Sequence, residues 1–216
     1  SITYGDVLVV GVELPADVAN GAIVSVGNVT KEVVLTDGKG SVEFADLGAG
    51  DYAVVVSYDG DNNYLEALNN ATEISVSKVV VAVDVVADAV VYGDNVIVNV
   101  TGSVAGDYTV TVDGVTKDVT VESAGDFVSV DFGVLAANVD GYAILANYTE
   151  TTNYVGVANT TEVVVVNKAE TPIVVVADSI TYGDVLVVGV ELPADVTEIA
   201  AVTVGNVTKE VVLTDG

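Results

Sequence analysis

The residues of this chain that could do chemistry are almost all carboxylates. There are 32 Asp and Glu against six Lys, and there is no His, Cys or Arg. Without those three residue types, the usual nucleophile–base pairs, zinc sites and anion clamps cannot be built. A carboxylate pair could still hydrolyse a glycoside, but no pair stands out among so many acids. We therefore expect that the protein is not an enzyme.

One loop has the spacing of a hard-cation site. The letters DGDNN place Asp59, Asp61 and Asn63 at alternate positions, and Glu66 could complete the ligand set. Oxygen ligands at alternate positions, with a glycine that permits a tight turn, open many calcium loops. A plain turn in which an Asp caps its own backbone explains the same letters. Calcium is the one cofactor that the sequence suggests, either in this loop or between neighbouring repeats, where further acids lie at Asp84, Asp88, Asp94, Asp178 and Asp184.

Asparagine followed by any residue and then threonine is the acceptor pattern for N-linked glycans. The pattern occurs at Asn28, Asn70, Asn99, Asn147, Asn159 and Asn206. None of these positions falls on a face that the alternation of residues predicts to be buried. They are our candidate glycosylation sites, and N-linked glycans would place the chain outside the cell.

The sequence contains internal repeats, and these must be identified before the fold can be predicted. Tyr-Gly-Asp occurs at 4–6, 92–94 and 182–184, and residues 1–18 return unchanged at 179–196. The unit is therefore about 90 residues long, and two units make a larger period of 178 residues. We predict three units, called unit one, unit two and unit three below: they span 1–78, 79–168 and 169–216.

Within each unit the hydrophobic pattern has a period of two. In the first strand segment Leu8, Val10 and Val12 point to one side, and short turns such as Asp-Gly separate the segments. Alternation at this period, with turns every 8–12 residues, predicts an all-β fold: tandem antiparallel immunoglobulin-like β-sandwiches with Greek-key links. Tyr52 and Tyr142 follow a turn and begin a strand, which is typical of the tyrosine whose hydroxyl bonds back to the chain in such sandwiches.

The order of the motifs YGD, GDY and NNY, with a lysine 14 residues before the next YGD, carries a resemblance. It resembles the immunoglobulin-like repeats of archaeal, especially methanogen, adhesin-like surface proteins, which are similar to bacterial Ig-like repeats. The resemblance covers essentially the whole chain. It implies stalk or adhesive modules at the cell surface, with no shared catalytic residues. Unit two departs from the pattern, with TETTNY at 149–154 where unit one has DGDNNY at 59–64.

The charge and the hydropathy limit the partners. A net charge of −26 argues against nucleic acid or an anionic membrane surface, since both bind basic patches. No apolar run reaches the ~18 residues that would span a bilayer, so we expect no membrane insertion in this segment. Two functions remain: a glycosylated stalk, fibre or filament on a prokaryotic, archaeal surface, or a ligand-binding adhesin module that recognises a glycan or protein of a host or neighbouring cell.

The unit boundaries predict a further partner. Unit one begins too late to contain the strand that precedes Tyr-Gly-Asp in unit two, and unit three holds only the first half of a unit. Half a sandwich has an open apolar face and unpaired edges, which are costly alone. We expect the missing strands to come from a continuing array or from other copies of the chain, which join head to tail or donate strands.

Overall fold

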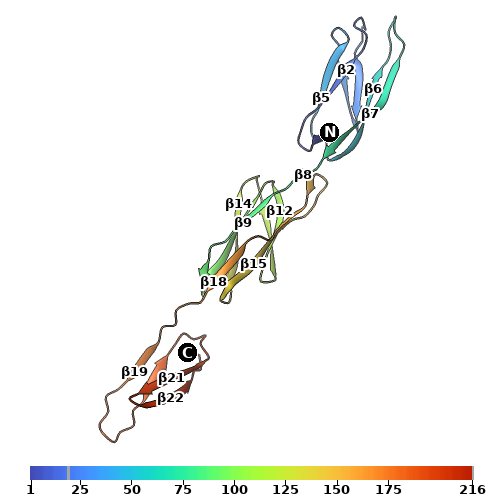
Figure 1. Cartoon of the computed structure of the whole chain (residues 1–216). Helices are drawn as coiled ribbons and strands as arrows, with labels where there is room; N and C mark the ends of the chain where they lie inside the picture. The colour runs from blue at the N-terminus through green and yellow to red at the C-terminus, as the bar shows by residue number, and fades with distance from the viewer. Residues whose placement is uncertain (19, 216) are drawn as a thin grey trace.

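The structure, a computed structural model, describes residues 1–18 and 20–215. Every regular element among these residues is a β-strand, which confirms the predicted all-β class and sandwich architecture. Figure 1 shows the strands gathered into three bodies that lie end to end in an elongated row. The N-terminus lies at the end of unit one that faces unit two.

Two packed sheets make up unit one. Its strands are β1 (Ile2–Thr3), β2 (Leu8–Glu13), β3 (Ala22–Val26), β4 (Val29–Val33), β5 (Lys39–Phe44), β6 (Gly50–Tyr58) and β7 (Ala67–Ser77). One sheet has the order β1-β7-β6-β3-β4, and β2 pairs with β5 in the other. Neighbouring strands are antiparallel, except that β1 runs parallel to β7.

The same plan, with added strands, makes up unit two. Its strands are β8 (Val79–Val80), β9 (Val83–Val86), β10 (Val90–Val91), β11 (Asn95–Gly102), β12 (Gly106–Val112), β13 (Val115–Val121), β14 (Phe127–Val134), β15 (Asn138–Tyr148), β16 (Tyr154–Val155), β17 (Val157–Asn159) and β18 (Val163–Asn167). The larger sheet has the order β10-β18-β15-β12-β13, with β17 also on β15, and the smaller has the order β14-β11-β9. β10 is parallel to β18, as β1 is to β7.

Alternation of side chains explains why these segments are strands. Along β11 the buried residues Val96, Val98 and Val100 are each 0% exposed, while the residues between them face outward. β-Branched side chains suit such a half-buried pleated surface. The predicted Asp-Gly turns are confirmed at 37–38 and 113–114, where both residues of each pair have positive φ. That is the backbone of a tight two-residue hairpin turn, which glycine and aspartate tolerate.

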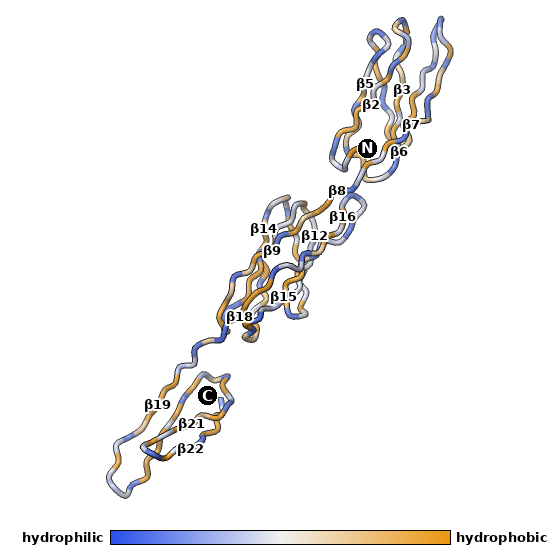
Figure 2. The backbone as a smooth tube through the Cα atoms, in the orientation of Figure 1, coloured by the Kyte–Doolittle hydropathy of each residue, from blue (hydrophilic) through white to orange (hydrophobic). Residues whose placement is uncertain are grey.

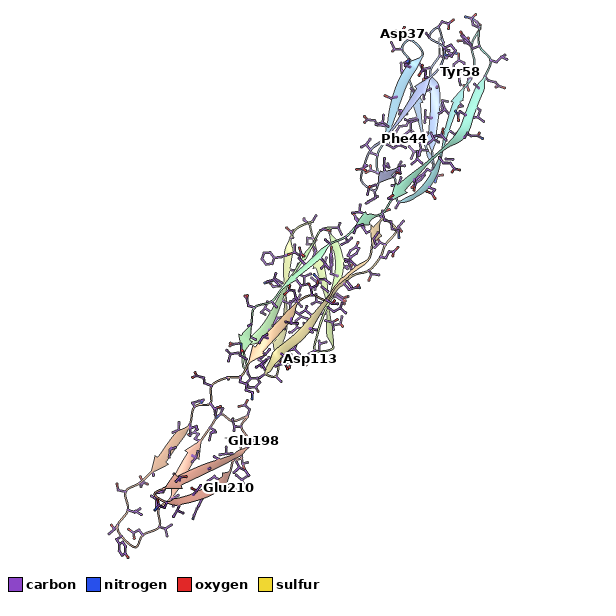
Figure 3. All side chains as sticks on the ribbon, viewed as in Figure 1. Asp37, Phe44, Tyr58, Asp113, Glu198 and Glu210 are labelled. Carbon is purple, nitrogen blue, oxygen red and sulfur yellow. The ribbon has the colours of Figure 1, made fainter. Side chains whose placement is uncertain are left out.

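Separate cores form in units one and two. One cluster of buried side chains, among them Val24, Phe44 and Val54, lies between the sheets of unit one. The other, among them Val98 and Tyr108, lies between the sheets of unit two. No charged or polar side chain of the described residues is buried, so the carboxylates lie on the surface. Figure 3 shows this outward spread of side chains, with Asp37 and Tyr58 at the far end of unit one.

The strands of unit three are β19 (Val174–Ala177), β20 (Val188–Glu191), β21 (Ile199–Val204) and β22 (Val207–Val212), in two pairs. β20, β21 and β22 repeat the first half of unit one without its cover, and β19 corresponds to β9 of unit two. Figure 2 shows hydrophobic segments along these strands, as in the other units. Val26 of unit one is 0% exposed, whereas its counterpart Val204 is 48% exposed. The difference arises because β5, β6 and β7, which close the core of unit one, have no counterpart among the described residues of unit three.

Candidate functional site

The six candidate glycosylation sites all lie outside the cores. Asn28 and Asn206 occupy the two-residue turns between β3 and β4 and between β21 and β22, and both are exposed. Asn70 is exposed on β7, while Asn99, Asn147 and Asn159 are half-buried on β11, β15 and β17. The amide Nδ2 of Asn159 donates to the carbonyl of Val83 at 2.8 Å. Whether glycans occupy these positions stays a prediction, and the exposed residues Asn28, Asn70 and Asn206 are the most open of the six.

The predicted calcium loop is a turn that Asp61 caps. Its Oδ1 accepts the backbone N–H groups of Asn63 at 2.7 Å and Tyr64 at 2.9 Å. Its Oδ2 accepts the hydroxyl of Tyr58 at 2.7 Å. This is the self-capping turn that the sequence left as the alternative. Across residues 1–18 and 20–215 no group of three or more acids has the arrangement of a metal site, and calcium at Asp59, Asp61, Asn63 and Glu66 stays a prediction.

The acids predicted to lie between repeats are exposed, and two of them cap their own turns. Asp94 and Asp184 each donate a backbone N–H to the residue three positions back, at 3.0 Å. The carboxylate of Asp184 also accepts the N–H of Thr181 at 3.0 Å. The backbone N–H of the Tyr-Gly-Asp acid therefore closes the turn that precedes the next strand of its unit.

Both predicted tyrosine hydroxyl bonds to the backbone are present. Tyr52 donates to the carbonyl of Gly48 at 2.9 Å, and Tyr142 donates to that of Ala136 at 3.0 Å. Tyr108, the one tyrosine without a counterpart in another unit, donates in the same way to Val104 at 2.8 Å. These bonds fix the chain just before a long strand, as the sequence predicted.

The most specific polar arrangement in the described chain is the junction between units one and two. We call the end of a unit that carries its Tyr-Gly-Asp turn the base, and the opposite end, with loop 59–65 or 149–155, the tip. Asn153, at the tip of unit two, makes one bond to unit one and one to the first residue of the linker strand β8. Its Oδ1 accepts the N–H of Ala49 at 2.9 Å, and its carbonyl accepts the N–H of Val79 at 2.9 Å.

Aromatic, charged and strand contacts surround Asn153. The ring of Tyr154 meets that of Tyr4 edge-on, with 5.5 Å between centroids. β16 pairs in parallel with β8, the short strand that leaves unit one. Lys78 Nζ lies 2.5 Å from Glu150 Oε1 and donates to the carbonyl of Thr151 at 2.8 Å. The tip of unit two thus clasps both the base of unit one and the linker between them.

The junction between units two and three uses the base of unit two. A hydrogen bond to Asp195 raises the pKa of Tyr92, the tyrosine of the second Tyr-Gly-Asp. Between them lies a hollow of about 270 Å³, bordered by Lys168 and Thr171 of the linker and by Pro193 of unit three. In unit one the counterpart of Asp195 is Asp17, which accepts the hydroxyl of Tyr64 at 2.7 Å.

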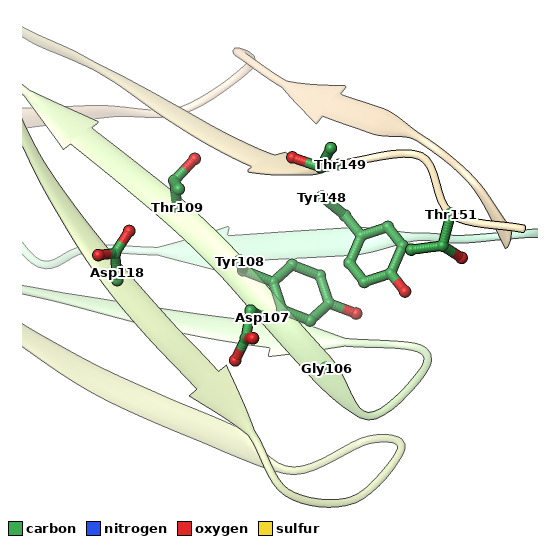
Figure 4. Close-up of a pocket in the computed structure, with 8 residues that line it drawn as sticks. All are labelled: Gly106, Asp107, Tyr108, Thr109, Asp118, Tyr148, Thr149 and Thr151. Carbon is green, nitrogen blue, oxygen red and sulfur yellow. The ribbon is translucent and has the colours of Figure 1, made fainter.

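A hollow of about 640 Å³ opens beside the tip of unit two, as Figure 4 shows. Two of its residues are tyrosines, whose ring centroids lie 4.9 Å apart. Tyr108 is 1% exposed and Tyr148 is 5% exposed, because their rings belong to the core. Their faces are therefore closed to the stacking contacts that aromatic side chains make with a sugar.

Sequence reasoning noted the repeated Asn-Tyr pairs and the repeated lysines and assigned Asn63 to a calcium loop, but it placed none of them at a junction between units. The structure brings Lys78 and Asn153 to one junction, although 75 residues separate them in sequence. The signal that could have found them is their recurrence, since Asn63 and Lys168 occupy the same positions in the neighbouring units.

Comparison with known proteins adds no relative. No protein-family model matches this chain, and no curated protein matches it significantly. The resemblance to surface-protein repeats stays a prediction. Among the described residues there is also no helix long and apolar enough to cross a membrane.

Proposed function

We propose that this chain is a stretch of an extracellular structural protein, a stalk or fibre of stacked β-sandwich units on a prokaryotic, archaeal surface. The observation that carries the proposal is the clasp between units one and two. A flexible tether would leave two linked units free to turn, whereas here the loop 149–155 holds the base and the linker of the preceding unit at once. Repetition of such junctions gives a rod.

The composition supports the same role. A net charge of −26, with no charged side chain buried among the described residues, gives a strongly repulsive surface that opposes lateral aggregation. The candidate glycosylation sites lie on exposed or half-buried positions of all three units, so attached glycans would coat the rod along its length.

Electron microscopy of the native cell surface, with antibodies raised against this chain, tests the proposal. We expect labelled filaments with an axial repeat of about 40 Å, since strands of roughly ten residues span ~33 Å and the turns at each end add to this, or twice that for two units. Mass spectrometry of the same material should find glycans on several of the six asparagines. Labelling confined to the cytoplasm would refute the proposal. Short labelled projections that bind a defined glycan on an array would instead support the adhesin alternative.

A further inference from the structure

The tip of unit one has the backbone conformation of the tip that clasps. In unit two the N–H of Thr151 donates to the carbonyl of Tyr154 at 3.1 Å, and the N–H of Tyr154 donates to the Thr151 hydroxyl at 3.2 Å. In unit one the N–H of Asp61 donates to the carbonyl of Tyr64 at 2.8 Å, and the N–H of Tyr64 donates to the Asp61 carboxylate at 2.9 Å. The loops 61–64 and 151–154 therefore form the same turn, although different residues cap it.

Two positions of the clasp have exposed apolar or amide counterparts at the tip of unit one. Asn63 stands where Asn153 binds the base, and it is exposed. Leu65 stands where Val155 pairs with the linker, and it is 90% exposed, against 37% for Val155. Covering an almost fully exposed leucine beside a preformed turn would stabilise a contact there, because apolar area is removed from water. Figure 1 shows that this loop, between β6 and β7, lies at the end of unit one farthest from unit two.

The base of unit two has the features that such a tip recognises. Leu135, Ala136 and Ala137 align with Leu47, Gly48 and Ala49, because Tyr142 bonds to Ala136 as Tyr52 bonds to Gly48. Lys168 aligns with Lys78, and the N–H of Ala169 with that of Val79. A positive lysine also complements the acids Asp59 and Asp61 of the unit-one tip.

Unit three supplies an independent indication that this base and this tip meet. Residues 179–196 of unit three are identical to residues 1–18 of unit one, and Asp195 lines the same hollow as Tyr92 in the base of unit two. Asp17 is the same residue in the tip of unit one. β19 also pairs with β20, whose sequence VGVE is that of residues 10–13 on β2. In unit three, the segment that ends at Asp178 therefore leads directly into the sequence with which unit one begins at Ser1, and its strand β19 pairs with that sequence.

We infer that the tip of unit one, formed by Asp17, Asn63, Tyr64 and Leu65, is a docking site for the base of a second copy of unit two, joined ahead of Ser1 by the linker 168–178. Asn63 accepts the N–H groups of Ala137 and Ala169, and Leu65 covers the linker. The inference rests on the proposed stacking and names the partner of this tip. The contact is small, so it depends on the tether, which raises the effective concentration to the millimolar range.

A tandem chain tests this pairing. It consists of residues 1–178 followed by residues 1–216, so that unit two of the first copy precedes unit one of the second through the natural linker. The chain has no cysteine, so an introduced pair is unique. We place Ala136→Cys in the first copy and Asn63→Cys in the second. The reference pair is Gly48→Cys with Asn153→Cys in the 216-residue chain, since a Cβ on Gly48 would lie 3.3 Å from Asn153 Oδ1.

A disulfide forms only when the two Cβ atoms approach to about 4 Å. We expect the tandem pair to cross-link like the reference pair, and about tenfold more than a control in which Thr36→Cys, exposed near the same end of unit one, replaces Asn63→Cys. Cross-linking no greater than that of the control would overturn the inference.

A second measurement avoids cysteines and decides the matter if a variant folds poorly. The amide proton of Ala169 in the first copy should exchange about tenfold more slowly in the tandem than in the 216-residue chain, where no tip loop is linked to it. Equal exchange would overturn the inference. Both readouts are independent of cell-surface filaments, so this pairing can fail while the proposed function stands, and the reverse.

Discussion

The clasp between units one and two can be tested by deleting the side chain of Asn153. Asn153→Ala removes the acceptor of the Ala49 N–H, a part-buried hydrogen bond of 2.9 Å, and keeps the backbone carbonyl that accepts the Val79 N–H. Loss of one such bond costs about 1 kcal/mol. If the contacts act as one clasp, the ratio of closed to open junction should fall about fivefold.

Amide hydrogen exchange followed by NMR is the assay. The N–H groups of Ala49 and Val79 should both exchange about fivefold faster in the variant, although only the first loses its acceptor. The matched control is Asn63→Ala, the same substitution in the equivalent turn at the far end of unit one, which should leave both amides unchanged. If Val79 keeps its exchange rate while Ala49 alone speeds up, the contacts are independent and the clasp reasoning is wrong.

Three further predictions concern the cores and the tip. Tyr108→Phe removes the hydroxyl bond to Val104 and should lower the stability of unit two by about 1 kcal/mol, measured by urea unfolding, with no loss of β signal in circular dichroism. Gly102→Ala places a Cβ against the buried Tyr108 ring and should lower the free energy of unfolding by about 1–3 kcal/mol. In a Tyr108→Ala background, where that ring is absent, the same substitution should have little further effect. Burial and the Asp61 bond raise the pKa of Tyr58 from its ordinary value of 10.0 to about 12. Because the folded state then holds a proton that the unfolded state loses, stability should fall as the pH rises from about 10 to 12, and Tyr58→Phe should abolish the latest step of the tyrosine absorbance titration.

The features that could be predicted from sequence, the strands and the hairpin turns, depend only on residues that are neighbours in the chain. The alternation Leu8, Val10, Val12 decides which side of β2 is covered, and Asp-Gly at 113–114 decides a turn through its own backbone freedom. Both depend on neighbours in the chain, so the class of fold and the hairpins follow directly.

The contacts of the clasp and the hydrogen bonds of Asp61 depend on the three-dimensional arrangement of residues, which the pattern of neighbouring residues in the sequence does not determine. Ala49 and Asn153 are 104 residues apart, and they meet only because two finished sandwiches adopt one relative orientation. Asp61 has the spacing of a calcium ligand, but its oxygens are turned inward to two backbone N–H groups and a tyrosine hydroxyl. Spacing alone does not reveal the direction in which a carboxylate points.

The parallel pairing of β10 with β18 has a mechanical consequence. β10 follows β8 and β9 near the start of unit two, and the chain leaves the unit along β18; β10 and β18 are joined side by side through Tyr92 N and Asn167 O at 2.8 Å. Tension applied to the two ends of the array pulls these strands in opposite directions, so their hydrogen bonds are loaded in shear and must break together. β1 and β7 repeat the arrangement in unit one. In the proposed rod, units one and two would therefore both resist stretching.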